Sequence, residues 1–206
     1  MRVLKLGGSL YRSPSLPDWL AMLARQQGLV LVPGGGPFAD QVREAQRRWG
    51  FADACGHRMA LLAMAQYGQM IAALQPGLVA VSERSELDTA LARGETPVCL
   101  PGPLLDGDGL PRDWSVSSDT LALWLARKLG ARALILVKSV PPERQATGAR
   151  ELARAGIIDA AFASMMHADP PAAVFWAGDG QHPLVNQFLE NDTPVGVDTH
   201  LAAILA

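Results

Sequence analysis

Two glycine-containing segments, each directly after a short apolar run, have the composition of anion-binding loops. They occupy residues 5–9 (KLGGS) and 33–37 (PGGGP). Glycines at a strand end let backbone N–H groups approach an anion without side-chain obstruction, and Lys5 adds a positive charge to the first segment. The second precedes a helical pattern, and a helix N-terminus carries about +0.5 of an elementary charge. Both segments favour phosphate binding, although a plain strand-to-loop turn accounts for either one alone.

The chain has only three lysines, and two of them end apolar runs. These two are Lys5 and Lys138, and the third is Lys128. Ligands of α/β sheets bind beyond the carboxyl ends of the strands, where both lysines would lie. Asp119 opens a helical pattern after residues 114–118 (WSVSS). Helix capping, worth about 1 kcal/mol, would explain an acid there; orienting a lysine ammonium near a phosphate is the alternative.

Several common catalytic motifs are missing. Residues 34–39 (GGGPFA) match the dinucleotide pattern G-x-G-x-x-A, but the acidic residue expected about 20 positions later is replaced by Met59. The chain contains no Gly-Lys pair for a phosphate-loop motif and no G-x-S-x-G hydrolase elbow. The histidines show no metal-ligand spacing, so no protein-held metal is predicted.

The composition predicts one globular domain over residues 1–206. The chain is 49% hydrophobic and 18% charged, with a formal net charge of −2 at pH 7, which disfavours a broad nucleic-acid surface. No apolar run approaches the ~18–20 residues of a membrane span, and no signal peptide is recognised. Cys55 and Cys99 are isolated, which disfavours a disulfide framework. A cytoplasmic protein is expected.

Apolar runs and helical patterns alternate along the chain. This alternation predicts an α/β fold in which helices cover both faces of a mostly parallel sheet, a three-layer αβα sandwich. Strands are expected at 3–6, 29–32, 78–81, 98–100, 133–137, 173–176 and 195–197. Helices are expected at 16–27, 38–49, 52–74, 86–93, 118–129, 147–155 and 183–190.

Three segments together resemble the amino acid kinase superfamily, which includes acetylglutamate, aspartate, carbamate and uridylate kinases. They are residues 3–10 (VLKLGGSL), 32–36 (VPGGG) and 117–122 (SSDTLA). Their order and spacing both agree with the superfamily, and the resemblance covers residues 1–140 well and the remainder loosely. It implies the fold of these kinases, an acceptor-binding lobe at residues 1–108 and a nucleotide-binding lobe at residues 109–206.

Within that superfamily the chain is similar to a short branch, the aminomethyl-furan-methanol phosphate kinases of methanofuran-type cofactor biosynthesis. The similarity rests on residues 32–40 (VPGGGPFAD), 50–53 (GFAD), 57–64 (HRMALLAM) and 66–68 (QYG). The implied reaction transfers the γ-phosphoryl group of ATP to that phosphate-bearing acceptor. An amino-acid carboxylate or UMP is the alternative acceptor, and a non-catalytic protein that binds a nucleotide or an oxoanion is a further alternative.

The resemblance also implies roles for individual residues. Lys5 would stabilise the transferring phosphoryl group, and Asp119 would position that lysine. The nucleotide would contact Gly7, Gly8, Ser9 and Lys138. The acceptor would contact Gly34, Gly35, Gly36, Asp40, Asp53 and His57, the acids being candidates for an ammonium group. Mg²⁺ would be held largely by ATP oxygens and water, and a homo-oligomer is implied.

One segment departs from the superfamily. Its members often carry Thr-Asp-Val-Asp-Gly where residues 138–142 here read KSVPP, and two prolines remove backbone N–H donors. Residues 155–170 contain no lysine, although acetylglutamate-kinase-like members carry one on a late helix. Lys138 is the candidate substitute.

Overall fold

The computed structural model describes residues 1–143, 146–168, 173–190 and 201–205. The strands are β1 (Arg2–Leu6), β2 (Leu29–Pro33), β3 (Leu78–Val81), β4 (Thr96–Cys99), β5 (Leu134–Lys138), β6 (Ala146–Gly148), β7 (Val174–Gly178) and β8 (Ala202–Leu205). The helices are α1 (Leu16–Leu23), α2 (Gly36–Trp49), α3 (Asp53–Leu74), α4 (Arg84–Ala92), α5 (Ser118–Lys128), α6 (Ala149–Arg154), α7 (Ala160–Ala168) and α8 (His182–Glu190). Two short 3-10 helices are η1 (Gly8–Arg12) and η2 (Asp179–Gln181).

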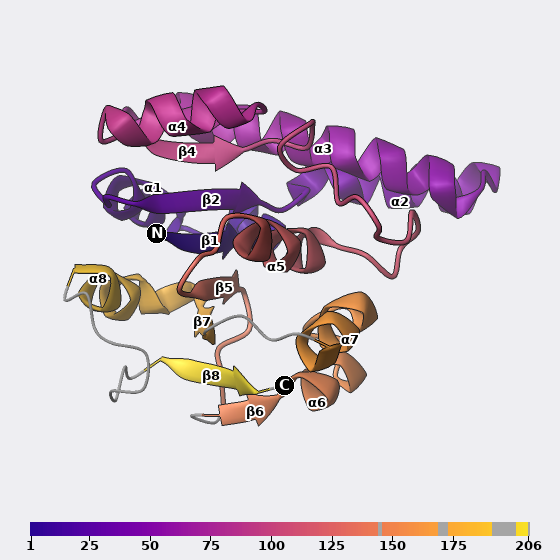
Figure 1. Cartoon of the computed structure of the whole chain (residues 1–206). Helices are drawn as coiled ribbons and strands as arrows, with labels where there is room; N and C mark the ends of the chain where they lie inside the picture. Colours follow the sequence, from indigo (N-terminus) through magenta and orange to yellow (C-terminus); the bar gives the residue numbers. More distant parts are fainter. Residues whose placement is uncertain (144–145, 169–172, 191–200, 206) are drawn as a thin grey trace.

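The strands form a single sheet in the order β3-β4-β2-β1-β5-β7-β8-β6, with helices on both faces (Figure 1). Every neighbouring pair is parallel except β7 and β8, which are antiparallel. The predicted α/β fold with a mostly parallel sheet is therefore confirmed. Strands β1 and β5 pair at the centre of the sheet, so that residues from both halves of the chain meet there.

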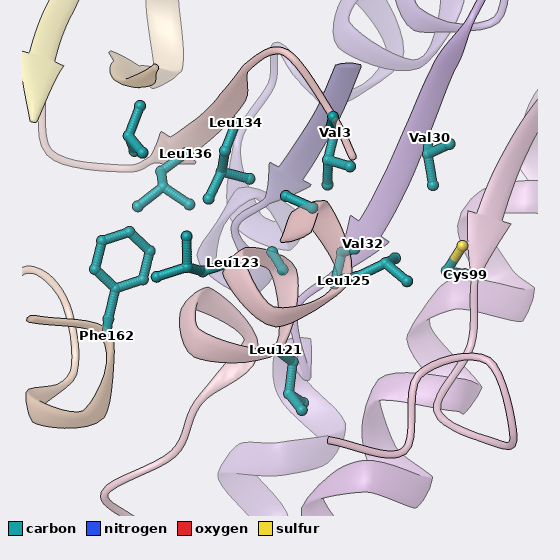
Figure 2. Close-up of a cluster of buried hydrophobic side chains, with 14 of the residues drawn as sticks. Val3, Val30, Val32, Cys99, Leu121, Leu123, Leu125, Leu134, Leu136 and Phe162 are labelled. Atoms are coloured by element: carbon teal, nitrogen blue, oxygen red, sulfur yellow. The ribbon is translucent and has the colours of Figure 1, made fainter. Parts of the chain in front are cut away.

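The sheet separates two apolar cores, because successive side chains of a strand point to opposite faces. Val3 of β1 belongs to the core beneath α5, where Leu121 and Leu125 of the helix are fully or almost fully buried (Figure 2). Leu4 belongs to the opposite core, which includes Trp19 of α1. Lys5, two residues after Val3, must therefore project towards the face that α5 covers.

The C-terminal third differs from the sequence-based expectation. The predicted helix at 147–155 is a three-residue strand, β6, followed by the shorter α6, and neither α7 nor β8 was predicted. Among the described strands, β6 lies at the sheet edge and pairs only with β8. A three-residue segment gives no local signal of such a long-range pairing. The predicted strand at 195–197 lies outside the described residues. None of the described helices combines the length and apolar character that a membrane span requires.

Candidate active site

The two glycine loops touch each other at the carboxyl ends of β1 and β2. These strands are paired neighbours, and the N–H of Gly34 donates to the carbonyl of Leu6 at 2.9 Å. A Cβ atom on Gly8 would lie 2.4 Å from the nitrogen of Gly36, and one on Gly34 would lie 2.4 Å from the nitrogen of Gly8. Only residues without side chains allow this approach, so the two loops form one bare backbone surface.

Beside this surface, a buried carboxylate lies between two ammonium groups. The Nζ atom of Lys5 is 3.0 Å from Oδ1 of Asp119, and Nζ of Lys138 donates to Oδ2 of the same side chain. Lys5 and Asp119 are only 5% and 2% exposed. Lys138 also donates to the carbonyl of Ile157 at 2.6 Å. With all three groups ionised, the cluster places a net positive charge next to the glycine loops.

The position of Asp119 follows from the way α5 begins. The side chain of Ser117 caps the helix by accepting the N–H of Asp119 at 3.2 Å. Helix capping is thus performed by the serine, and the carboxylate of Asp119 in the first turn is directed to the lysines. Of the two explanations left open by the sequence, the observed contacts match lysine orientation.

Burial and charge act in opposite directions on this cluster. Burial opposes ionisation of Asp119, but the adjacent ammonium groups of Lys5 and Lys138 outweigh it and hold the pKa of the carboxyl below its ordinary value. Burial lowers the pKa of Lys5, with a further contribution from the like charge of Lys138, while Asp119 opposes the shift. The carboxylate is therefore the charge that keeps two ammonium groups close together in a buried site.

A cavity of about 460 Å³ opens over the cluster and the glycine loops. It collects ten of the residues predicted for the site, from both halves of the chain. They are Lys5, Gly7, Gly8, Ser9, Gly34, Gly35, Gly36, Asp40, Asp119 and Lys138. Asp40 forms an exposed ion pair with Arg43 at 3.0 Å, and Arg43 also lines the cavity.

Two predicted residues, Asp53 and His57, do not line this cavity. Asp53 accepts a hydrogen bond from the side chain of Gln46 at 2.8 Å. His57 is buried and lines a second, mainly apolar cavity of about 420 Å³, where burial lowers the pKa of its imidazole. Val116 lines the apolar cavity and Ser117 lines the first one, so both cavities border the segment that leads into α5.

Two contributors to the site were not predicted from the sequence, the carbonyl of Ile157 and the carboxylate of Asp159. The first accepts from Lys138, and the second accepts hydrogen bonds from Ser117 and Thr120 at the start of α5. Asp159 precedes an apolar helix, which is the pattern of an ordinary N-cap. That local signal marks a helix start but does not reveal the partner helix.

A third, smaller hollow adjoins the first cavity on the side of β5. Its volume is about 210 Å³, and its lining includes Val140, Pro141 and Trp176. Both hollows share Val140 and Ile157. Within the described ranges, no group of three or more histidine, cysteine or acidic side chains could hold a metal ion.

The sheet with helices on both faces, and the two touching glycine loops beside Lys5 and Lys138, define an α/β protein whose candidate site lies beyond its strand ends. The chain belongs to the amino acid kinase family, whose pattern it matches over residues 1–142.

A relative and two solved structures carry the comparison further. The [5-(aminomethyl)furan-3-yl]methyl phosphate kinase of Methanocaldococcus jannaschii is 28% identical over 145 residues, which are 68% of this chain and 66% of that protein. The uridylate kinase of Archaeoglobus fulgidus is similar in structure, with a TM-score of 0.71 and 16% identity over 99% of this chain and 98% of that one. The UMP kinase of Bacillus anthracis gives a TM-score of 0.68 and 11% identity over 99% and 94%. The TM-scores show that the two solved structures and this chain have the same fold.

Proposed function

We propose that the protein is an ATP-dependent phosphotransferase acting on a small acceptor that already carries a phosphate. The observation that carries this proposal is the contact between the two glycine loops beside Lys5, Asp119 and Lys138. Two loops in contact can hold two phosphate-bearing molecules end to end. Transfer of a phosphoryl group needs that arrangement and a neighbouring positive charge, rather than a covalent nucleophile on the protein.

In this proposal the side chains act by electrostatics and orientation. Lys5 would stabilise charge on the transferring phosphoryl group as the bond to the leaving ADP oxygen breaks and the bond to the acceptor oxygen forms. The N–H groups of Gly7 and Gly34 already donate to Val137 and Leu6, so other amides of the loops, those of Gly8 and Gly35 first, are the candidate phosphate donors. Asp119 would keep Lys5 directed at the reacting group.

Magnesium fits the site as a partner of the nucleotide. Both carboxylate oxygens of Asp119 face ammonium groups, and Asp40 pairs with Arg43. Mg²⁺ commonly retains several waters and is held through substrate phosphates, which suits a site without a carboxylate cage among its described residues. When bound, the ion would neutralise charge on the phosphate oxygens.

We assign the nucleotide to the lobe of residues 109–206, with its phosphates reaching Gly7, Gly8 and Ser9, and the acceptor to the lobe of residues 1–108. The hollow lined by Val140, Pro141 and Trp176 adjoins the catalytic cavity and offers an apolar surface to the adenine base. Pro141 provides no N–H donor, so base recognition there would depend on shape and stacking.

The proposed acceptor is [5-(aminomethyl)furan-3-yl]methyl phosphate, the substrate named for the relative from Methanocaldococcus jannaschii. Its phosphate would lie at residues 34–36, and its ring would extend past Val116 towards the apolar cavity that contains His57. Asp40 lines the phosphate cavity and is the candidate partner for the ammonium group. Asp53 and His57 lie outside the phosphate cavity, so they would act only on the distant end of the acceptor.

The direct test is turnover. The protein, MgATP and [5-(aminomethyl)furan-3-yl]methyl phosphate should release ADP and yield a diphosphate product, measured by a coupled ADP assay and mass spectrometry. Turnover with UMP or an amino-acid carboxylate, but not with the furan phosphate, would reassign the acceptor. ATP binding in calorimetry with no turnover on any of these acceptors would instead favour a binding protein of the same fold.

We also propose that the protein self-associates. Leu62 and Leu74 of α3 are 65% and 59% exposed, so this helix offers apolar side chains to a second copy of the chain. Light scattering coupled to size exclusion should give at least twice the 21.9 kDa of the chain, and a monomeric mass would contradict the proposal.

A further inference from the structure

The carboxylate of Asp159 joins the beginnings of two helices. Oδ2 accepts from the N–H of Ser117 at 3.0 Å, the hydroxyl of Ser117 at 2.6 Å and the N–H of Thr120 at 3.3 Å. Oδ1 accepts from the hydroxyl of Thr120 and from the N–H of Phe162 at 2.7 Å. The first four donors belong to the start of α5, and the last belongs to the first turn of α7.

Both helix starts are connected to Lys138. Asp119, which contacts both lysines, lies between the two α5 residues that Asp159 binds. The carbonyl of Ile157, two residues before Asp159, is the other acceptor of Lys138. The two acceptors of this ammonium therefore come from segments that Asp159 fastens together, and a shift between those segments would alter both contacts at once.

We propose that Asp159 is a positioning residue, which fixes Asp119 and the Ile157 carbonyl relative to each other and so sets the places of Lys138 and Lys5. The proposal rests on the phosphotransferase function proposed above. The simpler alternative is a capping residue that stabilises α7 without influencing the lysines.

A serine at position 159 separates these two roles. Serine is a good N-cap, so Asp159→Ser keeps a hydroxyl for the N–H of Phe162 but is too short to bridge to α5 as well. Asp159→Asn keeps the size of the side chain. Both oxygens of the native carboxylate accept hydrogen bonds, so the NH₂ group of asparagine would replace one acceptor and face a backbone N–H that also donates. We expect both variants to lose the bridge.

The kinetic test compares kcat with KM in these variants. Misplacement of a catalytic group by about 1 Å costs on the order of 100-fold in rate, so kcat should fall about ten- to one-hundredfold. The KM for ATP, which Lys138 would contact, should rise by a smaller factor, and the KM of the acceptor should stay near wild type. In a Lys138→Met background the same substitution should lower kcat less, because one of the two lysines that Asp159 positions is already gone. Ser117→Ala and Thr120→Val remove the hydroxyl donors on α5 and should reproduce the loss if the variants at 159 fold poorly.

A second readout is independent of turnover. Lysines labelled with ¹³C at Cε give three signals, from Lys5, Lys128 and Lys138, and Lys128 contacts Asp106 and Trp124 instead of the cluster. Asp159→Ser should shift the signals of Lys5 and Lys138 and leave Lys128 in place. A matched control is Glu86→Ser, since Glu86 caps α4 through the N–H groups of Ser82 and Glu83; it should lower the melting temperature without moving any lysine signal.

The outcomes distinguish the two proposals. Unmoved lysine signals in Asp159→Ser, or equal losses of kcat in the wild-type and Lys138→Met backgrounds, would overturn the positioning role. Shifted Lys5 and Lys138 signals in a protein that turns over none of the acceptors would support the positioning of the lysines and reject the proposed function.

Discussion

The contact between the glycine loops makes Gly8→Ala a sharp perturbation. The added Cβ would lie 2.4 Å from the nitrogen of Gly36 and 2.9 Å from its Cα, whereas relaxed heavy-atom contacts lie at roughly 3.5–4.0 Å. Both neighbours are backbone atoms, so no side chain can rotate away. The loops must therefore separate by about 1 Å, which is the difference between the 2.4 Å contact and a relaxed contact of roughly 3.5 Å.

That displacement should affect both stability and rate. Overpacking of this kind costs about 1–3 kcal/mol, and at roughly 2–4 °C per kcal/mol for a chain of this size the melting temperature should fall by about 2–12 °C. Separation of the loops by about 1 Å should lower kcat/KM on the order of 100-fold. Activity should thus decline at temperatures where the variant is still folded.

The assay pairs thermal unfolding by circular dichroism with ADP release from MgATP and the furan phosphate. Gly180→Ala is the matched control, because Gly180 is exposed and an added Cβ there meets no described atom within 4 Å. The control should retain its activity and melting temperature. Wild-type kcat/KM in Gly8→Ala would refute the idea that both loops hold reacting phosphates.

Three further predictions follow from individual side chains. Lys5→Met removes a buried ammonium and should lower kcat about 10²–10³-fold without unfolding the protein, which an unchanged kcat in the ADP assay would contradict. The two lysines outweigh burial and depress the pKa of Asp119, so its charge stabilises the fold at pH values above the ordinary pKa of 3.8. That contribution is lost as the pH falls through the depressed pKa. The urea midpoint of unfolding should therefore decline less between pH 7 and pH 3 in Asp119→Asn than in wild type. Burial raises the pKa of Tyr67 from 10 to about 12, so stability present below pH 10, on the order of 2–3 kcal/mol, should be lost as the pH rises to about 12. Tyr67→Phe should be at least as stable as wild type at pH 7, since the native hydroxyl is buried with no hydrogen-bond partner in the described part of the chain. Between pH 10 and pH 12 the free energy of unfolding should fall less in the variant than in wild type.

The central strands and the first half of the site were predictable because their signals are local. The strand before residues 7–9 is apolar apart from Arg2 and Lys5, and the strand before residues 34–36 is fully apolar. Each is buried and is followed directly by glycines. Parallel strands place their carboxyl ends at one edge of a sheet. The position of Lys5 at this edge therefore follows from residue order once the strand is recognised.

The acceptor side was harder to predict because helix geometry spreads its residues. Asp40 lies in the first turns of α2, while Asp53 begins α3 after a 14-residue helix and a turn. With a rise of 1.5 Å per residue, such a helix carries the chain about 21 Å away from the glycine loop. Asp53 is consequently held by Gln46 near the far end of α2, outside the cavity that Asp40 lines.

Residues 138–142, which depart from the superfamily pattern, pack closely against strand β7. A Cβ on Gly178 of β7 would lie 2.7 Å from Cα of Pro141, and Trp176 donates to the carbonyl of Val140 at 3.0 Å. The segment is thus fixed against the neighbouring strand, and its first residue, Lys138, is directed to Asp119. The two lysines come from separate halves of the chain and meet at one carboxylate, so their spacing depends on contacts made by both halves. Loss of the bridge at Asp159 should therefore change the spacing of the lysines. Because the lysines are proposed to act on the transferring phosphoryl group, the rate should be affected more than the affinity for either substrate.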